Sequence, residues 1–398
     1  MKNKFVMIAG LLAMLFSGCK LDSNPSDAIT TTSLSTSLDG LTNAVNGAYA
    51  LFKDHVTFNG SIDDNLMYLR NFYQLSDFAS DDVVCGQVTT DPLYLSFSLD
   101  HSPTQTNSRY FWYISYKIIN DANTVIEQGE KQANPTAADL VINSSRFTES
   151  TASAFPAMFA NAATNPETIF CIAFTTLDDY GKFGSIASQY YSNGNSGWGE
   201  EYASQPLRNL YAQNATDVRS SYIVPLVDNT NTVQLKNGIP IYYVTKFSNQ
   251  GGSPTLSSPI MFRLSEMYLN KAEAEAKLGQ NAQALADIDI IRKNRGLQNA
   301  LYNGVVPSNL TVLQAVLQER RLELAFEGHR TYDVYRNKLN MDRTYWGYHL
   351  PGLKESDINL SVSPTGYANE IIPYTSTKII YYLPVDEVLS NPLATQNP

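Results

Sequence analysis

The stretch PIMFRLSEMYLNKAEAEAKLGQNAQALADIDIIRKNRGL, residues 259–297, decides the fold. Residues 259–277 and residues 281–294 each predict a helix from the spacing of their apolar side chains. Leu278-Gly279-Gln280 lies between them and predicts a tight turn. The segment is therefore expected to form a helical hairpin.

Small residues mark the places where these two helices would cross. Ala272, Gly279, Ala284 and Ile288 fall at spacings like those of a tetratricopeptide hairpin, with glycine at the turn. Gly296 is expected to end the second helix in a left-handed conformation. Such hairpins bury their apolar faces by stacking on neighbours. The sequence therefore predicts a mainly α fold with tetratricopeptide-type helical hairpins as its scaffold.

The rest of the chain adds further helices, short strands and long irregular loops to this scaffold. Helices are predicted at residues 36–53, 108–127 and 310–326, the last broken at Gly328 and resuming to about residue 336. In helix 108–127 an apolar stripe is expected to face the core, with Trp112 as a core residue: Trp112, Tyr116, Ile119 and Ile126. Short strands are predicted at 240–247 and 377–385, and irregular loops at 83–107 and 181–205.

The N-terminus predicts the compartment. Residues 1–18 combine Lys2 and Lys4 with a short apolar run, as in a secretory signal peptide. Phe16-Ser17-Gly18-Cys19 resembles a bacterial lipobox, in which Cys19 is acylated and becomes the first mature residue. The alternative is an ordinary signal peptide with an incidental cysteine. Residues 19–35 would then be a lipid-anchored tether, and residues 36–398 a single domain.

Charge and cysteine content limit the function classes. The net charge is −10, and loss of Lys2 and Lys4 lowers the basic count from 28 to 26 against 38 acidic residues, giving −12. This balance argues against nucleic-acid binding, which requires a basic surface. Cys85 and Cys171 are expected either to pair in an oxidising compartment or to remain as free thiols.

The acidic residues favour a structural role over a catalytic one. Glu319, Glu323 and Glu327 recur every four residues on one helix face, where like charges repel. They therefore predict a buried ion-pair network with four arginines: Arg263, Arg295, Arg320 and Arg330. The pairs Asp81-Asp82 and Asp178-Asp179 are expected at helix caps, turns or solvated loops rather than as the facing carboxylates of a glycosidase.

No known catalytic or metal signature is present in the sequence. It contains no G-x-S-x-G, H-E-x-x-H or P-loop pattern, and its four histidines lack metal-ligand spacing. We therefore expect no catalytic residue, no metal site and no cofactor.

The loop at 181–205 is the main candidate for ligand binding. Sugars stack their apolar faces on aromatic rings while amide and charged groups bind their hydroxyls, and this glycine-rich loop offers both. Its candidate residues are Tyr190, Tyr191, Asn193, Asn195 and Trp198, of which Trp198 is the strongest. The alternative is an ordered loop whose rings pack on the scaffold. The cluster at 345–348 is a further aromatic candidate.

Several motifs in order resemble those of the SusD/RagB family of outer-membrane nutrient-binding lipoproteins. They include a helix with Trp112, Tyr116, Ile119 and Asn123, and the following segments: NGAY (46–49), ETIF (167–170), DVR (217–219), RLSEMYLNKAEA (263–274), RKNRGL (292–297), ERRLELAFEGHR (319–330) and QNP (396–398). The matches extend over nearly the whole chain.

This resemblance implies a SusD-like protein that captures a ligand and does no chemistry. It implies an oligosaccharide as the ligand, a SusC-like TonB-dependent transporter as the partner, and a lipid-anchored position on the outer membrane. Peptide capture is the alternative within the family, and a surface glycoside hydrolase or a partner-docking module are the alternatives outside it. The resemblance also places Tyr94, in the loop at 83–107, at the border of the ligand site.

Overall fold

A computed structural model of the chain describes residues 47, 49–53, 57–62, 66–86, 92–99, 101–128, 141–343 and 370–397. These residues are mainly helical with a few short strands, which confirms the predicted fold class. None of their helices is both long and apolar enough to cross a membrane. Several predictions lie outside the described residues: the signal peptide 1–18, Cys19, the tether 19–35, most of helix 36–53, and the cluster 345–348.

In the part of the chain that the structure describes, short strands are interspersed among the helices and form no large sheet. The helices are α4 (Tyr68–Asp77), α5 (Tyr94–Ser98), α6 (Thr106–Gln128), α8 (Gly181–Gly184), α9 (Ala187–Tyr190), α10 (Gln205–Ala212), α11 (Leu264–Lys277), α12 (Asn281–Asn294), α13 (Val312–Glu323), α14 (Arg330–Arg336) and α15 (Val385–Ser390). The strands are β1 (Val83–Cys85), β2 (Thr168–Cys171), β3 (Glu201–Ala203), β4 (Ile223–Pro225), β5 (Leu235–Lys236), β6 (Ile239–Pro240), β7 (Tyr242–Val244), β8 (Ile260–Arg263), β9 (Met341–Arg343) and β10 (Glu370–Ile372). In the described part of the chain they form two-stranded antiparallel sheets: β1–β3, β2–β8, β4–β7, β5–β6 and β9–β10.

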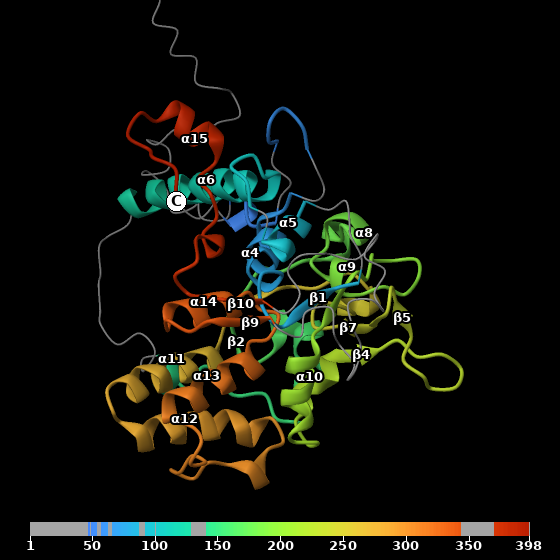
Figure 1. Ribbon diagram of the computed structural model, residues 1–398, viewed down its shortest axis with the longest axis vertical. Helices are drawn as coiled ribbons and strands as arrows, with labels where there is room; N and C mark the ends of the chain where they lie inside the picture. The colour runs from blue at the N-terminus through green and yellow to red at the C-terminus, as the bar shows by residue number, and fades with distance from the viewer. Residues whose placement is uncertain are drawn as a thin grey trace, which may run out of the picture.

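The predicted hairpin is present as α11 and α12, which pack with α13 at the lower left of Figure 1. Ala272, Ala284 and Ile288 are fully buried between these helices. The two alanines are small enough to allow the helices a close approach. Gly279 has a φ of +77° at the turn, which favours glycine. Helix α11 begins at Leu264, five residues later than predicted, since β8 precedes it and pairs with β2.

The predicted network of glutamates and arginines lies at the centre of the fold. Glu323, at the end of α13, is fully buried and accepts hydrogen bonds from Arg263 and Arg295, at 2.5 and 2.8 Å. Arg219 also binds Glu323, at 3.1 Å, and Glu319, at 2.7 Å. Burial raises the pKa of Glu323, but the guanidinium groups of Arg295, Arg263 and Arg219 outweigh it and hold that pKa well below its ordinary value.

The other two predicted partners bind elsewhere. Arg320 lies 3.1 Å from Asp333, and Arg330 lies 2.8 Å from Asp81. The prediction that these two arginines pair with Glu319, Glu323 and Glu327 was therefore wrong. On a helix, the residue beside a glutamate points to a different face, so Arg320 follows Glu319 in sequence but packs against another element.

The predicted strand at 240–247 is confirmed by β6 and β7, whereas the strand at 377–385 is wrong. The turn Thr377–Ile379 is a short 3-10 helix, and the chain then runs extended to α15. Side chains replace the hydrogen bonds of a partner strand here. Gln396 bonds both the N–H and the carbonyl of Leu383, at 2.8 Å each, and Tyr381 donates to the carbonyl of Leu75.

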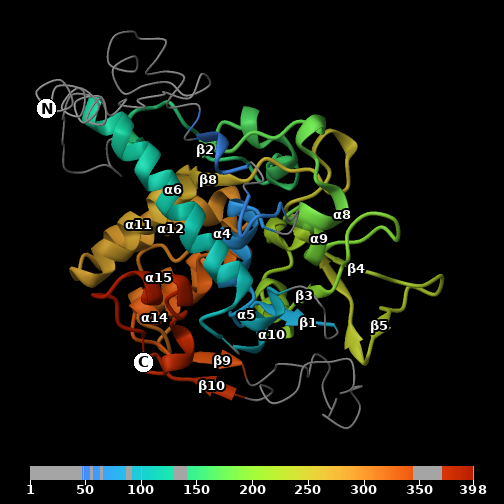
Figure 2. The ribbon, with the colours of Figure 1, turned by 90° about the horizontal axis from the view of Figure 1, so that it is seen from above.

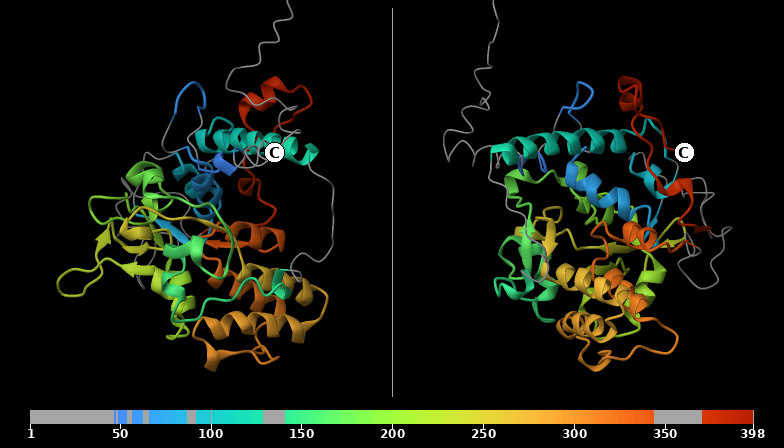
Figure 3. Two further views of the ribbon diagram at one scale, coloured as in Figure 1. Left: turned by 180° about the vertical axis from the view of Figure 1, so that it is seen from behind. Right: turned by 90° about the vertical axis from the view of Figure 1, so that its left-hand side faces the viewer.

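Helix α6 confirms the predicted helix 108–127 but presents the opposite face to the core. Figures 2 and 3 show it lying across α4. Tyr110 and Ile114 are fully buried against Leu66, while Tyr116 and Ile119 of the predicted core stripe are about half exposed, at 56% and 49%. The helix carries two apolar stripes, and the structure buries the one that the sequence analysis did not select.

Candidate ligand-binding site

The stretch 181–205 is not an irregular loop throughout, as predicted, because it contains α8, α9 and β3. Within it, the turn before Trp198 is held against α9 by backbone hydrogen bonds. The N–H groups of Trp198 and Gly199 both donate to the carbonyl of Ser188, at 2.6 and 3.0 Å. Gly197 has a φ of +79°, and a Cβ atom there would lie 2.0 Å from the carbonyl oxygen of Tyr191. Only glycine fits this position, and it turns the chain so that Trp198 follows at the surface.

Trp198 forms an aromatic corner with two residues of α8, Lys182 and Phe183. The Lys182 ammonium lies 3.7 Å from the centre of the indole ring, and the Phe183 ring stands nearly edge-on to it, 5.9 Å away at 73°. Trp198 is 40% exposed and Phe183 is 54% exposed. A cation over an exposed ring contributes roughly 0.5–1 kcal/mol, which holds the indole in one orientation.

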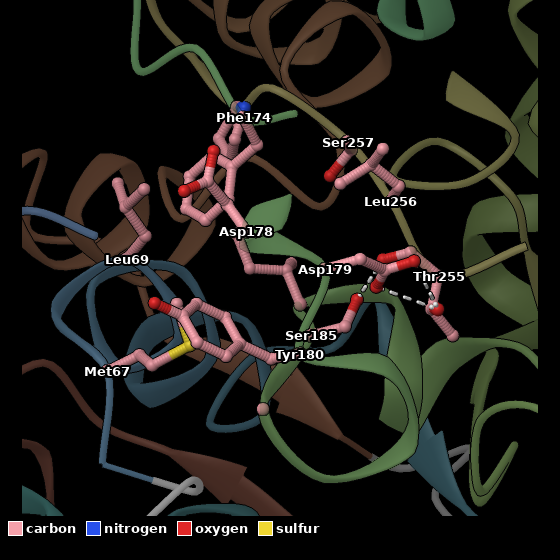
Figure 4. A pocket seen from close by; sticks show the side chains of 13 residues that line it. Met67, Leu69, Phe174, Asp178, Asp179, Tyr180, Ser185, Thr255, Leu256 and Ser257 are labelled. Carbon is pink, nitrogen blue, oxygen red and sulfur yellow. Dashed lines mark hydrogen bonds between the residues drawn. The ribbon is translucent and has the colours of Figure 1, made fainter. Parts of the chain in front are cut away.

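Asp179 fixes the start of α8 through hydrogen bonds. Its carboxylate accepts the N–H of Gly181, at 2.9 Å, and the hydroxyl groups of Ser253 and Thr255, at 2.5 and 3.1 Å. Figure 4 shows Asp179 and Thr255 among the residues that line a small pocket. The pocket has a volume of only about 20 Å³, which is room for about one water molecule rather than a ligand.

The neighbouring Asp178 caps a short helical turn with Thr175. Together with the turn at Asp179, this confirms the cap and turn roles predicted for the pair. Asp81 and Asp82 differ, because both are buried and bind arginines: Asp81 binds Arg330 at 2.8 Å and Asp82 binds Arg321 at 2.7 Å. Their prediction as cap, turn or solvated residues was therefore wrong.

Tyr190 belongs to the core and not to a binding surface. Its side chain is fully buried, its ring packs against Phe78 and Phe326, and its hydroxyl lies 3.3 Å from the carboxylate of Asp77. The prediction of Tyr190 as a ligand residue is therefore wrong. The short helix α9 turns this side chain inward.

The remaining predicted residues are either half-buried or exposed. Tyr191 is half-buried with its ring against Tyr243, at 5.6 Å, while Asn193 and Asn195 are exposed in the turn before Trp198. The side-chain carbonyl of Asn193 closes this turn by accepting the N–H of Asn195, at 3.0 Å. Tyr94 begins α5, where it is half-buried and stacks on Phe97 at 6.2 Å. Of the predicted rings, Trp198 is therefore the most exposed.

A family model described as the SusD family matches residues 174–398, which is more than half of the chain. The chain belongs to the SusD family. The SusD-like protein P38 of Formosa agariphila is 32% identical over 122 residues, a stretch that covers 26% of this chain and 24% of that relative.

Solved structures of SusD proteins share the fold. A SusD superfamily protein from Bacteroides thetaiotaomicron superposes with a TM-score of 0.70 at 20% identity, over 91% of this chain and 100% of that chain. The surface glycan-binding protein A from Bacteroides uniformis superposes with a TM-score of 0.58 at 15% identity, over 90% of this chain and 98% of that chain. These similarities confirm a SusD architecture over nearly the whole chain.

Two features of this SusD protein were not predicted. Lys182 and Phe183 lie within the predicted loop, and the run Lys182-Phe183 before a glycine is a signal that could have identified them. The second feature is an open groove of about 810 Å³ between α6 and α15, which is lined by Trp112 and Tyr116. Trp112 is half-buried at its edge, so the prediction that Trp112 is a core residue is wrong.

Cys85 and Cys171 are not joined to each other by a disulfide. Cys85 is buried in β1, and Cys171 is half-buried at the end of β2. Burial raises the pKa of the Cys171 thiol. The structure therefore does not have the pairing of these two residues.

Proposed function

We propose that this SusD-family protein captures an oligosaccharide at the cell surface and hands it to a SusC-like TonB-dependent transporter without changing it. The observation that carries the proposal is the aromatic corner, where an exposed indole is fixed by Lys182 and Phe183. An orienting contact reduces the entropy that a binding site loses when it closes on a ligand. The similarity in fold to a surface glycan-binding protein supports the same ligand class.

A binding role agrees better with the acidic residues than a hydrolytic one. Retaining and inverting glycosidases need two carboxyl groups facing each other across the substrate. Here Asp81 and Asp82 are bound to arginines, and Asp178 and Asp179 to capping and turn groups. Glu323 is buried among three guanidinium groups. These carboxylates therefore have structural roles in the fold.

The corner combines surfaces suited to a sugar ring. The partly exposed indole of Trp198 offers a flat apolar surface, and Lys182 offers hydrogen-bond donors beside it. Capture of peptides by the same surface is the second candidate, since an exposed aromatic ring also suits an apolar side chain.

Calorimetric titration of the full chain, in a detergent without a sugar headgroup, tests the proposal. We expect a saturating isotherm with one class of oligosaccharide and a loss of affinity of roughly tenfold or more for Trp198→Ala. Leu177→Ala is a matched control, because Leu177 is a 96% exposed apolar side chain on the preceding turn. If only peptides gave a saturating isotherm, the ligand would be a peptide and not an oligosaccharide. Continuous heat release with breakdown of the ligand would contradict a purely binding role.

The position on the outer membrane rests on Cys19. We propose that acylation of Cys19 anchors the protein, since multiple acyl chains hold a protein stably at a bilayer. Mass spectrometry of the mature N-terminus should find acyl groups on Cys19, and Cys19→Ser should release the protein from the membrane fraction. Membrane retention of Cys19→Ser would contradict the anchor.

A further inference from the structure

We propose that the groove between α6 and α15 is a second binding site, which takes a neutral oligosaccharide independently of the aromatic corner. The two helices lie together at the top of Figure 1, whereas α8 of the corner lies lower and to the right. The groove has a volume of about 810 Å³. This value lies within the range of about 300–1,000 Å³ that is common for ligand sites.

The floor of the groove is a continuous aromatic surface. Trp112, Tyr113 and Tyr116 project from one face of α6, because residues three and four apart lie on the same side of a helix. Trp112 and Tyr116 contact each other with ring centres 5.0 Å apart, and Phe58 packs on Tyr113 at 5.6 Å. Tyr113 is 40% exposed and Tyr116 is 56% exposed. Successive sugar rings could therefore stack along this face of the helix.

The opposite wall supplies the polar groups. Asp386, in the first turn of α15, binds Arg109 of α6 and joins the two helices. Glu387 follows it and accepts the side-chain N–H of Asn391, at 2.9 Å. Carboxylate, amide and guanidinium groups along one wall can bind the hydroxyl groups of a sugar whose apolar face rests on the floor.

The charge of the wall selects the class of oligosaccharide. Asp386 and Glu387 carry two negative charges, and Arg109, the guanidinium among the described residues of the groove, pairs with Asp386 and offsets one of them. The described lining therefore keeps a net charge of −1. The whole chain is also acidic, with a net charge of −10. A sulfated or carboxylated glycan would meet repulsion from both sources. A neutral glycan meets none.

The backbone of the walls disfavours an extended peptide. Peptides often bind by adding a strand to an open sheet edge, which offers unpaired N–H and carbonyl groups. The α6 wall is a long helix, whose backbone groups bond within the helix. The α15 wall is a short helix, and none of the described residues that line the groove belongs to a strand with an open edge. An amphipathic peptide helix would need an apolar groove, and Asp386 and Glu387 make one side of this groove acidic.

Titration of the Trp198→Ala variant tests the second site separately from the first. We expect that variant, as the full chain, to retain saturable binding of a neutral hexasaccharide drawn from malto-, cello- and xylo-oligosaccharides. Adding Trp112→Ala and Tyr116→Ala should weaken the remaining binding roughly tenfold or more. A galacturonic acid oligomer should not saturate the groove, and Glu387→Lys should improve its binding.

The outcomes separate the two proposals. If Trp198→Ala abolished all binding, the proposal of a groove site would be contradicted and that of a corner site supported. If only the groove substitutions abolished binding, the corner site would be contradicted and the groove site supported. Saturation of the groove by a basic peptide, or by the anionic oligomer, would overturn the ligand class. If the wild-type chain bound none of the glycans, both proposed sites would be contradicted. If Trp112→Ala fails to fold, Tyr116→Ala alone still tests the groove, because Tyr116 is exposed. Circular dichroism checks that each variant is folded.

Discussion

The guanidinium group of Arg295 donates to the carboxylate of Glu323 with 2.8 Å between Nη2 and Oε1, and neither side chain is exposed to solvent. The two residues lie on different segments, since Arg295 follows α12 and Glu323 ends α13. Their contact joins the end of the helical hairpin to the end of α13. A buried pair of this kind is strongly destabilising when one partner is removed, because the other charge stays buried.

Glu323→Gln should therefore lower the free energy of unfolding by about 3–5 kcal/mol. Three guanidinium groups, those of Arg219, Arg263 and Arg295, would lose their shared anion. Chemical denaturation measures the change. As a control, Lys277→Ala removes a partly exposed partner of Glu273 and should cost at most about 1 kcal/mol. Equal losses in the two variants would contradict the central role of Glu323.

Truncation of Tyr190 should lower stability, whereas truncation of Trp198 should weaken ligand binding. Tyr190→Ala removes a fully buried ring and should lower the free energy of unfolding by about 3–5 kcal/mol. Trp198→Ala removes an exposed ring and should change it by less than about 1 kcal/mol while weakening ligand binding. Thermal unfolding and titration of both variants check this. A stable Tyr190→Ala variant with impaired binding would show that Tyr190 reaches the ligand after all.

Gly197→Ala should disturb the aromatic corner more than Gly194→Ala. Both glycines have positive φ, +79° and +90°, so each alanine costs about 1–2 kcal/mol in backbone strain. The Cβ at 197 would also meet the carbonyl oxygen of Tyr191 at 2.0 Å, whereas the Cβ at 194 meets no atom within 4 Å. Gly197→Ala should therefore weaken ligand binding several-fold, measured by titration, and equal effects of the two changes would argue against the observed loop conformation.

Glu266→Gln should reveal a pH dependence in the wild-type protein. Burial raises the pKa of Glu266 to about 7, although Arg320 opposes the shift. The folded state therefore holds this proton at pH values where the unfolded state, with a pKa of about 4.3, has lost it. Wild-type stability should fall relative to Glu266→Gln as the pH rises from about 4.5 to 7. Denaturation midpoints of both proteins across this range provide the measurement, and a constant difference would contradict the raised pKa.

The candidate site was only partly predictable. The choice of residues 181–205 and of Trp198 as candidates follows from glycine, asparagine and aromatic residues in close succession. Which of its rings would be exposed does not follow. Tyr190 is buried by Phe78 and Phe326, which are over 100 residues away in either direction along the chain.

The same limit applies to α6. Its sequence predicts the helix correctly, and two stripes on its surface are apolar enough to face a core. Contacts with Leu66 place Tyr110 and Ile114 inside, and this leaves Tyr116 on the groove. The periodicity of one segment cannot choose between two apolar faces.

The sequence by itself determined the helical hairpin, its turn and the pairing of buried glutamates with arginines. These features depend on spacing within one segment, and on the need of a buried charge for a partner. Tertiary structure alone decided which arginine meets which acid, that residues 377–385 form no strand, and which aromatic rings lie at the surface. Each of these depends on the surroundings that distant segments provide, because burial is a property of the packed molecule and not of a residue.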